Sequence, residues 1–189
     1  MSAARFLILG LFASSGAQAA NPEWNAPQEP FAIHGNTYYV GTHGLSSVLI
    51  TSPAGHILID GGSQESPRQI VAHIRQLGFR IEDVKYILNS HEHYDHAGGI
   101  AELQRLSGAT VLSSVLGEPV LRTGLASKGD PQYADMPASM PAVANTRALR
   151  DGEQVRLGPL SVRAHYAPGL TQGGMSWSWQ STHDGRTVN

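Results

Sequence analysis

The chain has 189 residues, of which 41% are hydrophobic and 15% are charged, and its formal net charge is −2. This length suits one domain with a buried core, and the small net charge, without a cluster of Lys or Arg, gives no electrostatic basis for nucleic-acid binding. There is no cysteine. Disulfides and thiolate ligands are therefore excluded, and any bound metal must be held by histidine and carboxylate side chains.

The N-terminal segment MSAARFLILGLFASSGAQA has the pattern of a secretory signal peptide. Arg5 supplies a positive charge, the apolar run over residues 6–16 is too short to span a bilayer, and small residues precede a cleavage site after Ala19. Residues 1–19 are thus predicted to be removed. Residues 20–189 are predicted to form a periplasmic or secreted domain with no other membrane attachment. A frayed apolar helix is the alternative for the leader.

The first half of the remaining sequence predicts strands, followed by alternating helices and strands. A helix is predicted over residues 66–78, because Ser66 can cap it, Pro67 suits its first turn and Gly78 can end it. Short β-type runs between glycine and proline predict strands at residues 36–42, 45–51, 56–62 and 84–89, and the next helix and strand are predicted at 98–108 and 109–114.

The second half starts with a segment of no steady period, residues 124–148, which predicts a long loop. A hairpin at residues 153–168, a strand at 175–181 and a tight turn at Asp184-Gly185 follow. These elements predict a layered α/β class, with sheet and helices in separate layers. Because the strand after that turn begins near Thr187 and the sequence ends at Asn189, we expect a truncated chain, with a frayed tail as the alternative.

The segment NSHEHYDHAGG, residues 89–99, concentrates potential metal ligands. His91 and His93 are separated by one residue just beyond a predicted strand, so their rings can turn towards one point, and Asp95 and His96 can face a second. Imidazole and carboxylate are the ligands that zinc accepts without sulfur. The sequence therefore predicts a metal site made of these four side chains.

This H-x-H-x-D-H order resembles the signature of the metallo-β-lactamase superfamily. The segments GNTYYVGTHGLSSVLITSPAGHILIDGG, LNSHEHYDHAGGIAELQRLSGA and GGMSWSW further resemble the third subclass of zinc β-lactamases, secreted bacterial enzymes that open β-lactam antibiotics. The likeness runs from about Trp24 to Asn189. It implies an αββα sandwich of which the N-terminal half is present and the C-terminal half is largely missing.

The resemblance also implies two zinc ions, one bound by His91 and His93 and the other by Asp95 and His96. Zinc lowers the pKa of water towards neutrality, and Asp95 would be the catalytic residue that orients the resulting hydroxide towards the lactam carbonyl. A small β-lactam is the expected partner, and the chain is expected to be a monomer. Asp60 corresponds to a carboxylate that supports the site in the family, with a simple turn residue as the alternative.

The sequence departs from the family pattern at a ligand. The family's PGH element reads PGL here, so Leu170, which has no lone pair, stands where a third histidine of the first zinc is expected. His165 is expected to face solvent or a neighbour rather than replace it. A further histidine ligand would belong to the missing half. We therefore expect incomplete zinc occupancy, little or no turnover by this chain, incompletely covered strand faces and marginal stability.

Three functions stay open at this point: a secreted zinc β-lactamase, a degenerate non-catalytic remnant, and another hydrolase of the superfamily such as a glyoxalase-type thioesterase or a lactonase. Trp177 and Trp179 alternate in a predicted strand and are expected to pack in the core. The other histidines are expected to be exposed and structural: His34, His43, His56, His73 and His183.

Overall fold

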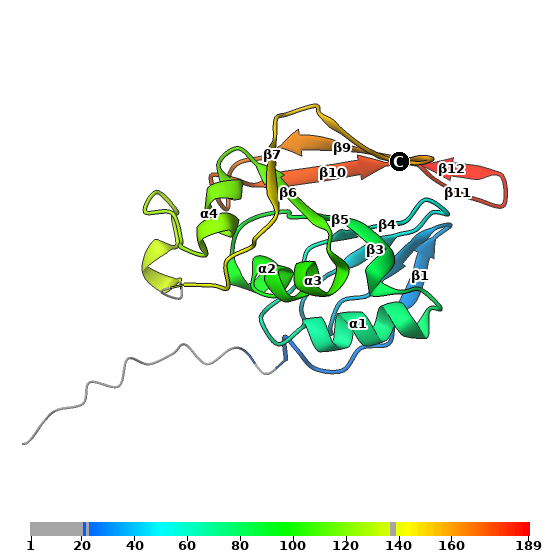
Figure 1. Cartoon of the computed structure of the whole chain (residues 1–189), viewed down its shortest axis with the longest axis horizontal. Helices are drawn as coiled ribbons and strands as arrows, with labels where there is room; N and C mark the ends of the chain where they lie inside the picture. Colours follow the sequence, from blue (N-terminus) through cyan, green and yellow to red (C-terminus); the bar gives the residue numbers. More distant parts are fainter. Residues whose placement is uncertain (1–20, 22, 137–138) are drawn as a thin grey trace, which may run out of the picture.

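The computed structural model describes residue 21, residues 23–136 and residues 139–189. The predicted signal peptide, residues 1–19, lies outside the described residues. A seven-stranded sheet forms the centre of the molecule, with helices on one face and a three-stranded sheet on the other (Figure 1). None of the described helices is long and apolar enough to cross a membrane.

The seven strands of the large sheet are adjacent in chain order. They are β1 (Phe31–His34), β2 (Thr37–Tyr39), β3 (Val48–Ile50), β4 (His56–Ile59), β5 (Val84–Leu88), β6 (Thr110–Ser114) and β7 (Thr146–Leu149). Pairing is antiparallel from β1 to β4 and parallel from β4 to β7. The carboxyl ends of β4, β5 and β6 therefore lie at one edge, where the histidine-rich motif follows β5.

The helices cover one face of this sheet. They are α1 (Pro67–Gln76), α2 (Tyr94–Ala97), α3 (Ile100–Ser107) and α4 (Gly117–Thr123), with 3-10 turns at Ile81–Asp83 and Tyr133–Asp135. Leu58 and Ile87 of the sheet pack in one buried cluster with Ile74 of α1 and Leu103 of α3. Burial of this apolar side fixes α1 and α3 against the sheet.

The opposite face of the large sheet is covered by β8 (Gln154–Leu157), β9 (Leu160–Tyr166) and β10 (Met175–Trp179). Ile50 and Ile57 point to this side, and both are 0% exposed in a cluster that includes Val162. The expectation that these strand faces would be incompletely covered is wrong for Ile50 and Ile57, because the small sheet covers them, and it holds for Val48 and Ile59, which are only partly buried. Trp177 and Trp179 are partly buried against this cluster, as expected.

The layered α/β class is confirmed: one helix layer and two sheets account for three of the four layers of an αββα sandwich. The last hairpin, β11 (Ser181–His183) with β12 (Arg186–Val188), has its predicted turn. Asp184 and Gly185 both have positive φ, 47° and 75°, which is the conformation that suits a two-residue hairpin loop.

Three local predictions are wrong. Residues 146–148 of the predicted loop belong to β7, because pairing with β6 and burial of Leu149 make a strand that its own short sequence does not indicate. Ser66 does not cap α1 with its side chain; its hydroxyl bonds Asn25 instead. His56 and His73 were expected to be exposed, but both are buried, with 7% of each residue accessible. The His73 ring nitrogen Nδ1 lies 2.9 Å from the carbonyl oxygen of Val40, which satisfies it inside the core.

Candidate metal centre

The motif begins where β5 ends. Asn89 is fully buried and its amide N–H bonds Leu112 of β6, so the chain leaves the sheet in a fixed direction. The short helix α2 then carries Asp95 and His96. Close packing limits the residues that follow, because a Cβ on Gly99 would lie 2.8 Å from the carbonyl oxygen of Ser63. Glycine is required there for the loop after β4 to approach the loop after β5.

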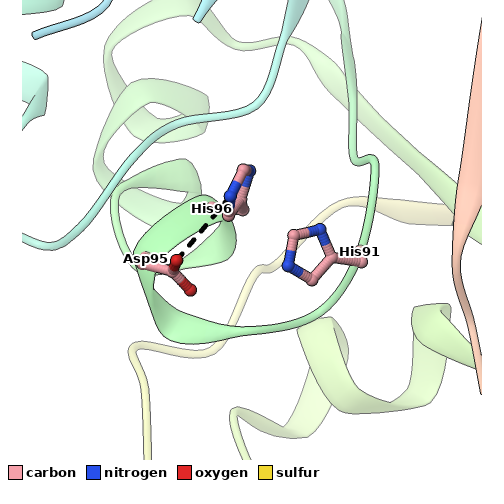
Figure 2. A group of neighbouring side chains, drawn as sticks. All are labelled: His91, Asp95 and His96. Atoms are coloured by element: carbon pink, nitrogen blue, oxygen red, sulfur yellow. Dashed lines mark ion pairs between the residues drawn. The ribbon is translucent and has the colours of Figure 1, made fainter. Parts of the chain in front are cut away.

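Three of the four predicted ligands come together. His91, Asp95 and His96 each offer a ligand atom, and these atoms lie within 4.8 Å of one another. Figure 2 shows the two rings and the carboxylate grouped at the start of α2. The ring centroids of His91 and His96 are 4.1 Å apart, and Nε2 of His96 is 3.7 Å from Oδ2 of Asp95. One divalent ion could accept donors from all three side chains.

This group of three joins His91, which was expected at the first zinc ion, with Asp95 and His96, which were expected at the second. His93 is next to it, with its ring centroid 5.0 Å from that of His91. Its Nε2 lies 3.0 Å from Oδ2 of Asp130, and both side chains are buried. The structure therefore brings His91, Asp95 and His96 into one donor set and ties one nitrogen of His93 to a residue of the long loop.

Asp60 supports the group from the end of β4. Its carboxylate accepts hydrogen bonds from the Ser90 amide N–H (2.7 Å) and the Ser90 hydroxyl (2.6 Å), and Nδ1 of His96 lies 3.0 Å from it. Asp60 itself has φ of 60°, an unusual left-handed conformation for a residue other than glycine. The Asp60 side chain, at the end of β4, thus bonds both Ser90 and His96 of the motif. With its Nδ1 at Asp60, His96 has its Nε2 facing Asp95.

The neighbouring histidines differ in their affinity for protons. Burial, together with the positive charge that His96 can carry, lowers the pKa of His91 to about 4. Burial also acts to lower the pKa of His96, but the hydrogen bond to Asp60 and the negative charges of Asp60 and Asp95 outweigh it, so the pKa of His96 is raised. His91 is thus a neutral ring with a free lone pair at neutral pH, as a metal ligand must be.

Leu170 lies at the position where the sequence lacks a histidine, and it is 55% exposed. It lines the same cavity of about 310 Å³ as the donor group. His165 does not take its place, because its Nε2 bonds the Ser178 hydroxyl at 2.7 Å. Among the described residues, the lining consists of Trp24, His91, His93, Tyr94, Asp95, His96, Gln132, Asp135, Met136 and Leu170.

Glu92 connects the loop that carries Leu170 to the motif. It lies between His91 and His93 in the sequence and is only 2% exposed. Its carboxylate accepts hydrogen bonds from the Thr171 hydroxyl (2.8 Å) and the Gly173 amide N–H (3.1 Å). Sequence reasoning missed both Glu92 and Asp130. The only available signal for Glu92 was a carboxylate between two predicted ligands.

The sequence profile of the metallo-beta-lactamase superfamily matches residues 40–183, which is most of the chain. The chain belongs to this superfamily. Its likeness to the third subclass is confirmed by the crystal structure of MEM-A1, a subclass B3 metallo-beta-lactamase isolated from a soil metagenome library. The two are 70% identical with a TM-score of 0.86, over 87% of this chain and 62% of that one. The chain thus spans 62% of the length of that relative.

Curated relatives within the superfamily match shorter segments. The N-acyl homoserine lactonase AttM of Agrobacterium fabrum is 36% identical over 28% of this chain and 28% of its own. The hydroxyacylglutathione hydrolase of Pseudomonas paraeruginosa is 33% identical over 48% of this chain and 26% of its own. These matches support the superfamily and do not distinguish one of its activities from another.

The donor chemistry fits the zinc that this metallo-beta-lactamase superfamily implies. Two imidazoles and a carboxylate are accepted zinc ligands, and three protein ligands with an open position are typical of catalytic zinc. The residues fit a second zinc less well. His93 already shares one nitrogen with Asp130, and Leu170 has no donor atom.

Proposed function

We propose that this protein is a zinc-dependent hydrolase that acts on β-lactams, with one zinc ion held by His91, Asp95 and His96. The observation that carries the proposal is the grouping of three ligand atoms within 4.8 Å at the wall of a cavity. The substrate class is supported by the 70% identity to MEM-A1, a named metallo-beta-lactamase. His93 is a further imidazole in the cavity lining, and we assign it a smaller share in zinc binding.

When bound, zinc would lower the pKa of water and polarise a carbonyl oxygen, which is the chemistry that opening an amide ring needs. The residues of the chain supply the rest. Asp60 accepts a hydrogen bond from the Nδ1–H of His96, so Nε2 of His96 stays free to bind metal. Asp95, a quarter exposed at the cavity, can accept a hydrogen bond from water and orient it. Trp24, Met136 and Leu170 offer apolar contacts for a small ring compound.

The proposal is tested by zinc stoichiometry together with substrate choice. We expect at most one zinc per chain; any hydrolysis of nitrocefin, which the missing ligand at residue 170 should keep slow, should be lost with a chelator and restored by zinc. Hydrolysis of an acyl homoserine lactone or of an acylglutathione thioester, with none of nitrocefin, would favour the activities named for the curated relatives. Bound zinc without turnover of any of the three would favour the non-catalytic remnant.

Leu170→His tests the missing ligand directly. Because residue 170 lines the cavity, a histidine there adds a donor to the same cavity as His93. We expect the stoichiometry to rise from one zinc per chain towards two, and nitrocefin turnover to increase. Leu125→His is the control, since Leu125 is equally exposed, at 56%, and is not part of the cavity lining. A rise in both variants would show adventitious binding to surface histidine.

We also propose a periplasmic or secreted location and a monomeric state. The location rests on the signal-peptide pattern of residues 1–19. Expression in a Gram-negative host, followed by fractionation and N-terminal sequencing, would test it, with a mature protein starting at Ala20 as the expected product. Sedimentation of that product would test the monomer.

A further inference from the structure

The buried hydrogen-bond contact of Asp130 with His93 is the strongest feature that the proposed chemistry does not use. Oδ2 of Asp130 lies 3.0 Å from Nε2 of His93, and the two side chains are 3% and 5% exposed. A buried carboxylate at this distance is costly unless it accepts a hydrogen bond. An ionised carboxylate can only accept, so Nε2 of His93 must carry the proton that it donates.

The backbone holds Asp130 in place independently of His93. Oδ1 of Asp130 accepts the Gln132 amide N–H at 2.7 Å, and the Asp130 amide N–H bonds Ser127 at 3.0 Å. The preceding Gly129 is packed against the side chain of Gln172, because a Cβ there would lie 2.8 Å from its amide nitrogen. The long loop is thus fixed where Asp130 meets the motif, on the same side as residues 170–173.

We propose that Asp130 is a positioning residue, which keeps the proton of His93 on Nε2 and thereby leaves Nδ1 as its only donor towards the cavity. The functional role assigned to Asp130 rests on the proposed zinc site. The arrangement of the ring does not depend on zinc. A carboxylate that bonds the second nitrogen of a metal-binding imidazole fixes both its tautomer and its orientation, and loss of such a partner typically lowers metal affinity by about tenfold to a hundredfold.

The first measurement is the tautomer of His93 in the metal-free protein, from the ¹⁵N shifts of its two ring nitrogens. We expect a protonated Nε2, bonded to Asp130, and an unprotonated Nδ1. In Asp130→Asn the amide can donate to Nε2, so the proton should move, wholly or in part, to Nδ1. Asp184→Asn is the matched control: it removes the same charge from an exposed residue outside the cavity lining, and it should leave the tautomer of His93 unchanged.

The second measurement is zinc affinity. We expect Asp130→Asn to weaken zinc about tenfold, His93→Ala to weaken it similarly, and the double variant to be no weaker than His93→Ala, because Asp130 acts through that ring. A proton on Nδ1 in the unchanged protein, a tautomer unaffected by Asp130→Asn, or additive losses of affinity would overturn the proposal. If the unchanged protein binds no zinc, the proposed function fails, while the tautomer still decides the role of Asp130.

Discussion

Two buried carboxylates hold histidines of this motif, and they reach it by different routes. Asp60 stands at the end of β4, directly beside the motif in the sheet, and it bonds His96. Asp130 comes from an irregular segment and bonds His93. His96 on the first side belongs to the group of three donors, whereas His93 lies outside that group and lines the same cavity as Leu170. The side built on the sheet has a donor set that can bind metal, and the side built on loops lacks a ligand.

The two sides also differ in how many hydrogen bonds fix the contact between carboxylate and histidine. The Asp60 side is surrounded by hydrogen bonds from Ser90 and Asn89, so its geometry is determined several times over. On the other side, the ring of His93 has one hydrogen-bond contact, to Asp130, which is itself fixed by the Gln132 amide N–H. We infer that zinc binding is dominated by the first side, and the predictions below test that difference.

The largest effect is expected from the ligands themselves. His96→Ala removes one of three grouped donors and should weaken zinc by more than about a hundredfold, since losing a supporting residue alone costs up to about that much. His93→Ala should weaken it only about tenfold. Competition with a chromophoric chelator measures both. Equal losses in the two variants would remove the distinction between the sides.

Asp60→Asn should weaken zinc by about tenfold to a hundredfold, because the amide no longer imposes the tautomer of His96. Asparagine tolerates the left-handed φ of 60° at this position, so the backbone need not change. Asp184→Asn makes the same substitution at the exposed residue that also has positive φ, and its zinc affinity should match that of the unchanged protein. Calorimetric titration with zinc is the measurement.

Glu92→Gln tests the attachment of the loop that carries Leu170. A buried acceptor is replaced by a group that must place an NH₂ beside the Gly173 amide or the Thr171 hydroxyl, and we expect a loss of about 1–3 kcal/mol in the free energy of unfolding. Urea unfolding measures it. Thr171→Val in the same background should cost less than it does alone, because the partner is already changed. Glu65→Gln, at an exposed site, should leave stability unchanged.

The smallest effect concerns pH. The pKa of His91 is about 4 in the folded protein, against 6.5 in the unfolded chain, so its contribution to stability is present above pH 6.5 and is lost as the pH falls towards 4. The raised pKa of His96 acts oppositely: its contribution is present below 6.5 and is lost as the pH rises through the folded value. Proton NMR titration of the metal-free protein should separate the two rings. Coincident titration of the rings would contradict the assignment.

Much of the fold could be predicted because short sequence patterns indicate single strands and helices. Short apolar β-type runs bounded by glycine and proline located β4 and β5, and the helical period with Pro67 located α1. The pairing partner of β7 could not be predicted, since its four residues become a strand only beside β6. The cover over Ile50 and Ile57 was missed for the same reason: a strand shows which face is apolar and does not show which element will bury it.

The sequence by itself determined the identity of the donors and the absence of a donor at residue 170, because ligand chemistry belongs to single side chains and short spacings. It also contains the signal-peptide pattern of residues 1–19. Only the tertiary structure decided which donors meet. His91, Asp95 and His96 form one group, and His93 pairs with a carboxylate 37 residues away. Such contacts depend on where the sheet ends and where loops cross, and those positions are set by packing of the whole chain rather than by any short segment.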